Sequence, residues 1–244
     1  MFYDLKKMLS PFEAISRHDS KFTAFNVILD FTLIPYRYYP TGEELKAAHE
    51  KLLAWPHKEM ITEFLTAMTD LQPEGFRDPL GEFYMMHISH GHLGQYFTPE
   101  HVTDMMAQIS IGDNPQPGQT VLDPACGSGR ALLSAAKINR HLRFYGADLD
   151  HICCKMALIN MLMNSLTGEI AHMNSLSNEF FRGYRCRTKL IDGYHYPYFI
   201  EFTDPNESLI WLHPRPTPKE PAAKPFDPTP TPLAQQPLTQ GSLF

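Results

Sequence analysis

Apolar residues recur three and four positions apart over most of the first 92 residues, which is the spacing of amphipathic helices. The clearest stretch runs from Leu45 to Leu71. Thr41 and Glu44 precede it with the spacing of a capping box, in which each side chain accepts a hydrogen bond from the other residue's backbone. Pro56 lies inside the stretch and lacks the amide hydrogen that a helix interior needs. The pattern therefore predicts helices in this region, with a break or a kink at Pro56.

From residue 94 onward the pattern changes to short apolar runs separated by helical stretches. Thr120–Leu122, Leu142–Ala147 and Glu169–Met173 are runs of the length and composition that favour strands. Between them lie Arg130–Asn139, with small residues on one face, and His151–Leu166, which is rich in Met and Ala. Strand, helix, strand, helix, strand is the order of a parallel sheet with right-handed crossovers. We therefore expect an α/β fold for this part of the chain.

Prolines are distributed unevenly, and nine of the 21 lie in the last 32 residues, mixed with Thr, Ala and Gln. Such a composition favours an extended, polyproline-type linker that cannot form a hydrophobic core. We expect three parts: an N-terminal helical region, an α/β domain and a disordered Pro-rich tail, over residues 1–93, 94–212 and 213–244 respectively.

Composition narrows the functional classes. Of the 244 residues 43% are apolar, which is enough to bury a core. The formal net charge of −6 argues against binding nucleic acid over the whole surface, so any DNA contact must be local or shared with a partner. No apolar run approaches the roughly 18–20 residues of a membrane span, and the N-terminus lacks the apolar core of a signal peptide. The four cysteines lack metal-ligand spacing, which favours reduced thiols and a cytoplasmic location.

Residues suited to a nucleoside ligand follow each predicted strand, and ligands bind at the carboxyl ends of strands in such sheets. After the first strand, Gly127 and Gly129 allow a tight turn and a close approach of the ligand, and Asp123 can hold the ammonium group of a methionine chain. Asp148 ends the second strand, 19 residues after Gly129, where nucleotide-binding folds place the acid that binds a ribose. Asn174 ends the third strand and can pair with an adenine edge. The alternative is that Asp148 lies in a solvated turn and that Asn174 caps a helix.

Five segments resemble a known family: DPLGEFY (Asp78–Tyr84), GQYFTPE (Gly94–Glu100), DPACGSG (Asp123–Gly129), GADLD (Gly146–Asp150) and HMNSL (His172–Leu176). The first of them also has the composition of a turn at Asp78-Pro79-Leu80-Gly81. Roughly residues 78–176 resemble the modification subunits of type I restriction systems and related adenine-N6 DNA methyltransferases.

The resemblance implies a Rossmann-like methyltransferase sheet, S-adenosylmethionine as cofactor and DNA as substrate. It further implies a partner subunit that supplies catalysis or specificity. By the same resemblance, the following residues line the cofactor pocket: Gln95, Phe97, Thr98, Pro99, Asp123, Ala125, Gly127, Gly129, Asp148 and Asn174.

The chain departs from the family at its catalytic motif, an Asp or Asn followed by two prolines and an aromatic residue, which holds the extruded base. No such tetrad occurs in the sequence, so the resemblance assigns no catalytic residue. The nearest string is Asp204-Pro205-Asn206-Glu207, between the β-prone runs Tyr198–Phe202 and Ser208–Leu212, where it predicts a hairpin turn. Only about 40 residues separate Asn174 from the predicted tail, so the sheet is truncated. Two hypotheses stay open: a DNA methyltransferase that needs a partner, and a catalytically silent module that binds cofactor or DNA and regulates another protein.

Three weaker signals have structural alternatives. His87, His90 and His92 have a conceivable metal-ligand spacing but better fit a polar loop, so we expect no metal site. Cys126 in the Gly-rich loop reads as a small packing residue. The only dense basic cluster can meet phosphates or a base, or form a solvated face; it comprises Arg182, Arg185, Arg187 and Lys189, interleaved with Phe181 and Tyr184.

The chain ends in Gln240-Gly241-Ser242-Leu243-Phe244, which resembles the short peptides by which bacterial replication and repair proteins dock on the sliding clamp. Leu243 and Phe244 are apolar anchors at the end of a segment without a core, and Gln240 can hydrogen-bond at a pocket rim. The sequence thus suggests the sliding clamp as a further partner; the alternative is an accidental apolar pair.

Overall fold

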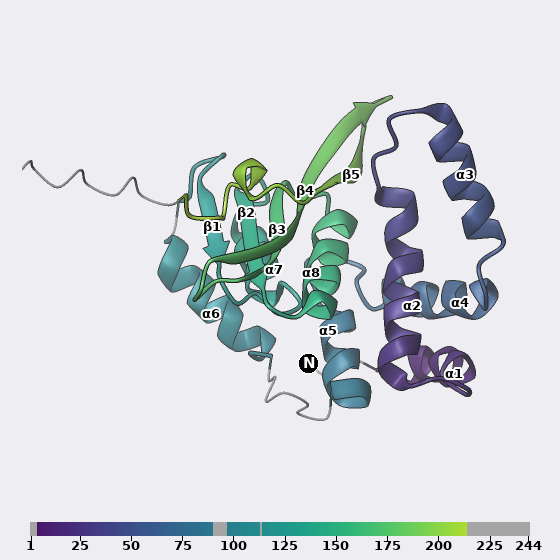
Figure 1. Cartoon of the computed structure of the whole chain (residues 1–244). Helices are drawn as coiled ribbons and strands as arrows, with labels where there is room; N and C mark the ends of the chain where they lie inside the picture. Colours follow the sequence, from purple (N-terminus) through teal and green to yellow (C-terminus); the bar gives the residue numbers. More distant parts are fainter. Residues whose placement is uncertain (1–3, 90–96, 113, 214–244) are drawn as a thin grey trace, which may run out of the picture. The chain divides into compact units, whose positions relative to one another are not determined.

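Helices form the N-terminal region of the computed structural model, which describes residues 4–89, 97–112 and 114–213 (Figure 1). In chain order they are α1 (Lys6–Ile15), α2 (Lys21–Leu33), the 3₁₀ turn η1 (Ile34–Tyr36), α3 (Gly42–Leu53), α4 (Lys58–Asp70), α5 (Pro79–Tyr84) and the π-helical turn η2 (Met85–Ser89). The predicted capping box is confirmed, because Thr41 Oγ1 accepts from the Glu44 amide and Glu44 Oε2 accepts from the Thr41 amide, both at 3.2 Å. The predicted break at Pro56 is confirmed as well, between α3 and α4.

One expectation for this region is wrong. Asp78 does not open a free turn but caps α5, where its carboxylate accepts a hydrogen bond from the Gly81 amide at 2.8 Å. Pro79 occupies the first helical turn, which tolerates proline because amides there lack helical partners. The aromatic residues that follow, Phe83 and Tyr84, are fully buried.

The second region alternates strands and helices and forms one five-stranded sheet in the order β1-β2-β3-β4-β5. Its elements are α6 (Glu100–Ile111), β1 (Thr120–Asp123), α7 (Arg130–Ile138), β2 (Arg143–Asp148), α8 (His151–Met163), β3 (Gly168–Asn174), β4 (Glu179–Ile191), β5 (Tyr194–Phe202) and the 3₁₀ turn η4 (Pro205–Glu207). The predicted parallel α/β unit is confirmed in β1, β2 and β3. β4 and β5 run antiparallel to their neighbours, so the sheet is mixed.

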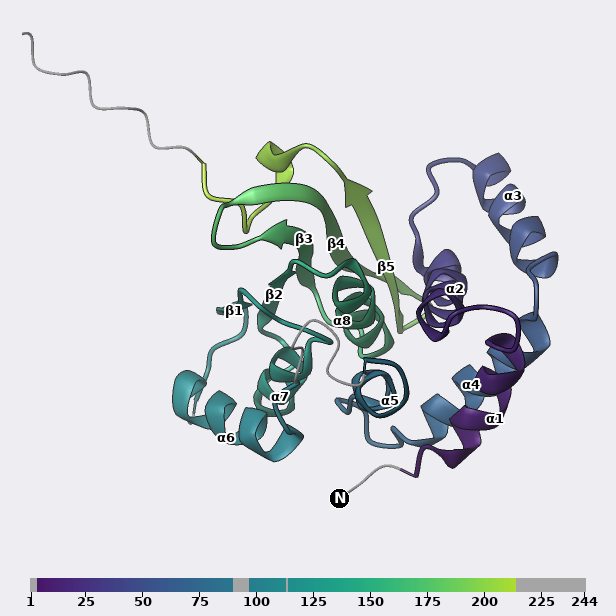
Figure 2. The same cartoon turned by 60° about the horizontal axis from the view of Figure 1, so that its bottom comes forward.

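Helices α7 and α8 cover one face of this sheet, and α1–α4 gather beyond α8 (Figure 2). Four phenylalanines, Phe12, Phe25, Phe64 and Phe83, are fully buried and pack edge-to-face or stacked between the N-terminal helices. The same hydrophobic core continues into α7, α8 and the sheet. The helical region and the sheet thus share one core up to Leu212, and a domain boundary near residue 93 stays a prediction.

A short C-terminal segment covers the other face of the sheet. Ile210 and Trp211 pack against Ala147, Ala171 and Met173. The expectation that Ser208–Leu212 is a strand is wrong, because the Ser208 hydroxyl accepts from the amides of Ile210 and Trp211 at 3.1 Å and thereby turns the chain. Beyond His213, the predicted tail and its clamp-like peptide lie outside the described residues.

β1 lies at one edge of the sheet and pairs only with β2 among the described strands. The sheet face at this strand is partly open to solvent, as the 55% exposure of Leu122 shows. The Gly-rich loop therefore leaves the sheet from an edge strand. In doubly wound sheets the ligand lies at a switch point with strands on both sides, and the described strands form only one of these sides.

At the opposite edge, β4 and β5 continue beyond β3 as a two-stranded ribbon (Figure 1). Asp192 and Gly193 connect them with φ values of 49° and 82°, which is the positive-φ pair of a type I′ hairpin turn. Within the described ranges, every helix is too short or too polar to cross a lipid bilayer.

Candidate cofactor site

The Gly-rich loop connects β1 to α7 at the carboxyl end of the parallel strands. Gly127 and Gly129 adopt φ values of 52° and 82°, which residues with a side chain rarely adopt. A Cβ atom on Gly127 would lie 3.0 Å from the Phe97 ring, and one on Gly129 would lie 3.1 Å from the Cβ of Ala157. Glycine is therefore required at both positions for shape as well as for conformation.

Asp148 extends from the end of β2 toward this loop. Its Oδ2 accepts from the Gly127 amide and its Oδ1 from the Asp150 amide, both at 2.8 Å. Asp123, at the end of β1, accepts from the Ala125 amide at 3.1 Å. Burial raises the pKa of both carboxyl groups, which two backbone amides partly offset at Asp148. The structure thus brings both predicted acids to the same loop and gives each a backbone donor.

Asn174 ends β3, and its side-chain oxygen accepts from the amides of Leu176 and Ser177 at 3.0 and 3.2 Å. It therefore caps the turn after β3, while its side-chain NH₂ group has no hydrogen-bond acceptor among the described residues. Ser175 Oγ donates to the carbonyl of Pro124 at 2.6 Å and so joins this turn to the Gly-rich loop. Contact of Asn174 with an adenine stays a prediction.

A small cavity of about 90 Å³ lies over the Gly-rich loop. Five of the ten predicted cofactor residues line it: Phe97, Thr98, Asp123, Ala125 and Gly127. Gly129, Asp148 and Asn174 belong to the same loop edge without lining the cavity, and Pro99 lines a separate hollow beside Arg130. The tenth, Gln95, lies outside the described residues.

A buried polar network, which the sequence did not suggest, supports the loop from below. Asp78 is 1% exposed and accepts from Ser128 Oγ at 2.5 Å, Arg130 Nε at 3.0 Å and Asn160 Nδ2 at 2.8 Å. Its space depends on Gly81, since a Cβ there would lie 2.2 Å from the Asp78 carboxylate. The network fixes the loop to α5 and α8.

Arg130 extends this network to a third segment. Besides Asp78, its guanidinium donates to Glu82 at 3.1 Å and to the carbonyl of Thr98 at 3.1 Å. One side chain thereby links the segments DPLGEFY, GQYFTPE and DPACGSG. Arg130 directly follows the last of these segments, but its partner Asp78 is 52 residues away, so sequence spacing gave no sign of the pair.

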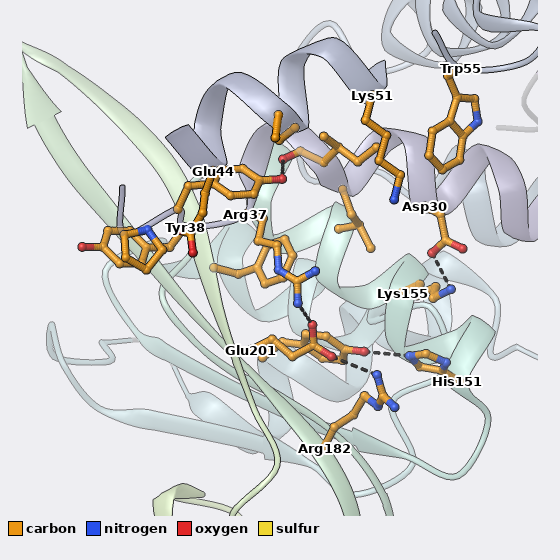
Figure 3. Close-up of a pocket in the computed structure, with 18 residues that line it drawn as sticks. Asp30, Arg37, Tyr38, Glu44, Lys51, Trp55, His151, Lys155, Arg182 and Glu201 are labelled. Atoms are coloured by element: carbon orange, nitrogen blue, oxygen red, sulfur yellow. Dashed lines mark hydrogen bonds and ion pairs between the residues drawn. The ribbon is translucent and has the colours of Figure 1, made fainter. Parts of the chain in front are cut away.

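A larger cavity, about 720 Å³, lies elsewhere, between α2, η1 and α3 on one side and α8, β4 and β5 on the other (Figure 3). Five of the charged residues that line it are paired with one another. Lys155 Nζ donates to Asp30 at 2.5 Å, and Glu201 accepts from both Arg37 and Arg182. These pairs connect the N-terminal helices to the helix α8 and the sheet. The cavity is therefore a polar interface between two parts of the fold, which we call the polar seam.

His151 lies at the floor of this seam, 2.7 Å from the Tyr184 hydroxyl, and its ring stacks on that of His172 at 4.8 Å. Burial, and then the positive charges of Lys155, His172 and Arg182, lower the pKa of His151 to about 4. His151 is thus neutral at physiological pH. It contributes a hydrogen bond to Tyr184 at this position without adding a positive charge.

No substitute for the missing catalytic tetrad emerges among the described residues. Asp204 is fully exposed and caps η4, where its carboxylate accepts from the Asn206 amide at 2.9 Å. Those hydrogen bonds lower its pKa. Asp204-Pro205-Asn206 is therefore a turn, as predicted, although it leads into an irregular segment rather than a hairpin strand. Cys126 is buried, as expected for a packing residue.

The described residues contain no group of three or more side chains able to hold a metal ion. His87 packs its ring against Phe83. His90 and His92 lie outside the described residues.

Comparison with known proteins bears on this site. Residues 77–193 match the family described as N-6 DNA Methylase. This part of the chain is similar to that family. The cofactor that the family implies is S-adenosylmethionine. The matched residues include DPLGEFY, the Gly-rich loop, Asp148 and Asn174, and thus all the residues predicted to line the cofactor pocket.

Individual relatives share the same region. The chain is 28% identical over 138 residues to the type I restriction enzyme MpnII methylase subunit of Mycoplasma pneumoniae, covering 51% of this chain and 24% of that protein. It is 35% identical over 106 residues to the type II restriction enzyme and methyltransferase RM.BcgI of Heyndrickxia coagulans, covering 35% and 16%. It is also 37% identical over 87 residues to the ribosomal protein L11 methyltransferase of Caldanaerobacter subterraneus, covering 35% and 27%. The chain spans about a quarter or less of the length of these relatives.

Proposed function

We propose that the chain binds S-adenosylmethionine at the carboxyl ends of β1, β2 and β3 and is the cofactor domain of an adenine-N6 DNA methyltransferase of restriction-modification type. The observation that carries this proposal is the positive-φ loop at Gly127 and Gly129, joined directly to Asp148. Two of the three relatives named above are restriction-modification proteins. When bound, the cofactor supplies a methyl group on a sulfonium centre.

The residues present suit the parts of this cofactor. The Asp123 carboxylate complements an ammonium group, Asp148 can accept from ribose hydroxyls, and the Asn174 amide can donate to an adenine nitrogen. The cavity of about 90 Å³ is smaller than the ligand pockets of roughly 300–1,000 Å³ found in proteins. Because the Phe97 ring packs against Gly127, we expect it to swing away when the cofactor enters.

Transfer to DNA needs an element that the described part of this chain lacks. The family's tetrad is absent from the sequence, and β1 has a free edge where doubly wound sheets continue. We therefore propose that a partner polypeptide adds a strand to β1 and brings the base-holding motif with it. The same two observations favour the second candidate, a silent cofactor-binding module, whenever no such partner is bound.

Calorimetric titration with S-adenosylmethionine tests cofactor binding. Asp148→Ala should lower the affinity at least about tenfold, because charge-assisted hydrogen bonds contribute roughly 1.5–3 kcal/mol. Asp204→Ala, which removes an exposed carboxylate elsewhere, serves as the matched control and should bind normally. Unchanged affinity in a folded Asp148→Ala protein would contradict the assignment.

Transfer of labelled methyl groups to DNA tests the catalytic part. We expect little or none from the isolated chain, because nothing holds the base. Robust transfer by the isolated chain that survives Asp204→Ala would show that the chemistry lies at residues we have not identified. A parallel assay with ribosomal protein as acceptor separates DNA from protein substrates.

We also propose that the terminal peptide Gln240–Phe244 docks on the bacterial sliding clamp, which would bring the protein to newly replicated DNA. Fluorescence anisotropy of a labelled peptide covering residues 233–244 measures this directly. Binding no stronger than that of a peptide with Leu243→Ala and Phe244→Ala would remove the idea.

A further inference from the structure

The basic cluster of β4 separates into two pairs with different roles. Arg182 donates to Glu201 at 2.9 Å, and Arg185 donates to the buried Glu169 at 3.3 Å while its guanidinium lies over the Phe202 ring. These two arginines are committed to the fold. Arg187 and Lys189 are exposed, and no acidic partner for either occurs within the part of the chain that the structure describes. Their charges are available to a ligand.

The strand register places aromatic rings beside these two cations. Opposite residues of an antiparallel pair share a face, and so do alternate residues of one strand. Arg187 is paired with Tyr198, Lys189 with Tyr196 and Ile191 with Tyr194. One face of the ribbon therefore presents the row Arg187, Lys189, Ile191 beside the row Tyr194, Tyr196, Tyr198, which we call the tyrosine–cation face.

The side chains of this face are exposed to solvent, and its two strands are fixed relative to each other. Tyr194 is 70% exposed and Tyr196 51%, which is high for large rings on a strand. The type I′ turn at Asp192 and Gly193 fixes the two strands against each other, so both rows stay aligned without a ligand. Asp192 is the only acidic residue between Cys186 and Tyr198, in a chain whose net charge is −6. The face is thus a local basic and aromatic site in an acidic protein.

We propose that the tyrosine–cation face binds single-stranded nucleic acid, with bases stacked on Tyr194 and Tyr196 and phosphates paired with Arg187 and Lys189. Alternate residues of a strand are about 6.6–6.8 Å apart, which is close to the repeat of an extended nucleotide chain. Stacking needs bases whose faces are uncovered, and only a single strand offers them. The choice of DNA over RNA rests on the proposed function. The argument that the face binds a single strand does not depend on it.

The test is fluorescence anisotropy of a labelled 20-nucleotide oligo-dT strand with the full-length protein. The double variant Tyr194→Ser, Tyr196→Ser should bind at least about tenfold more weakly, because each stacked base contributes strongly to affinity. The double variant Arg187→Gln, Lys189→Gln should also bind more weakly and reduce the salt dependence, with a slope lower by about 1.4, since each phosphate contact contributes about 0.7 in single strands.

A matched control, Lys7→Gln with Lys46→Gln, removes the same charge from exposed positions on α1 and α3 and should retain most of the affinity. A control loss equal to that of Arg187→Gln, Lys189→Gln would reduce the effect to overall charge and overturn the proposal. Unchanged binding in the tyrosine variant would also overturn it, as would duplex DNA binding as tightly as the single strand.

Two further measurements separate other occupants and other failures. Sedimentation that shows self-association of the wild type, lost in the tyrosine variant without an effect on oligo-dT binding, would assign the face to a second copy of the chain and overturn the proposal. Titration of the same variants with S-adenosylmethionine should give wild-type affinity, since the proposed cofactor site lies at the carboxyl ends of β1, β2 and β3, whereas residues 187–198 extend beyond the amino end of β3. If the proposed function is wrong, the wild-type protein will not bind S-adenosylmethionine in this titration. If only the present inference is wrong, S-adenosylmethionine will bind and the oligo-dT measurements alone will fail.

Discussion

The two halves of the sheet treat their polar residues in opposite ways. In the parallel half, Asp78, Ser128, Arg130 and Asn160 are buried and bonded to one another beneath the Gly-rich loop. In the antiparallel half, the outer part of the ribbon leaves Arg187, Lys189 and Tyr194 exposed. In the first half, buried polar groups hold a loop in place through hydrogen bonds. In the second half, polar groups are exposed to solvent. The difference agrees with the two proposals made above, because a cofactor site gains affinity from being preformed, whereas a flexible polymer can bind to a rigid row of exposed side chains.

The largest expected effect tests the buried half. Asp78→Ala leaves the buried Arg130 with Glu82 as its remaining carboxylate partner and removes the acceptor of Ser128 and Asn160, so it should lower the free energy of unfolding by about 3–5 kcal/mol. Urea denaturation followed by circular dichroism measures it. Asp19→Ala, an exposed acid on the surface, should change it by less than about 0.5 kcal/mol. A loss below about 1 kcal/mol in Asp78→Ala would show that the network adds little to stability.

A somewhat smaller effect tests the junction between the halves. Glu169 is fully buried on β3 and accepts from Ser208 Oγ at 2.5 Å, from the Leu209 amide at 3.2 Å and from Arg185. Glu169→Ala should cost about 2–3 kcal/mol, because Arg185, unlike Arg130, can turn partly to water. It should also release Trp211, visible as a red shift of tryptophan emission. An unchanged spectrum would contradict the role of Glu169 as the anchor of that segment.

The histidines beneath the large cavity predict a pH dependence. The pKa of His151 is lowered from 6.5 to about 4 in the folded protein, and burial lowers that of His172 as well. The unfolded chain therefore binds more protons over this range, and stability should fall as the pH drops from about 6.5 toward about 4. His151→Asn should flatten this fall. Denaturation midpoints at several pH values measure it, and equal slopes in both proteins would exclude His151 as a cause.

The smallest effect is expected in the exposed half. Arg187→Gln combined with Lys189→Gln should change the free energy of unfolding by less than about 0.5 kcal/mol, because neither side chain is buried. Thermal unfolding checks this on the protein used for oligo-dT binding. A loss above 1 kcal/mol would mean that these residues stabilise the ribbon, and the contrast between the two halves would disappear.

The sequence predicted the parts of the fold that depend on local order. The capping box at Thr41, the break at Pro56 and the three parallel strands all follow from spacing and turn chemistry within a few residues. It did not predict the antiparallel ribbon, because pairing of β4 with β3 and β5 depends on which edges are free. The Asp78–Arg130 pair was missed for the same reason, since it joins residues 52 positions apart. The roles of Asp148 and Asn174 stay predictions, although their hydrogen bonds place both at the expected edge.

The shortness of β1 sets how an added strand can be held. Four residues of backbone offer only a few hydrogen bonds, each contributing about 0.5–1.5 kcal/mol net, and free association of two proteins costs an estimated 4–15 kcal/mol or more. Pairing at this edge alone would therefore dissociate on dilution. A common DNA strand or a shared docking platform would raise the effective concentration of the two pieces into the millimolar range. Methylation by such a split enzyme would be confined to places where both pieces are tethered together.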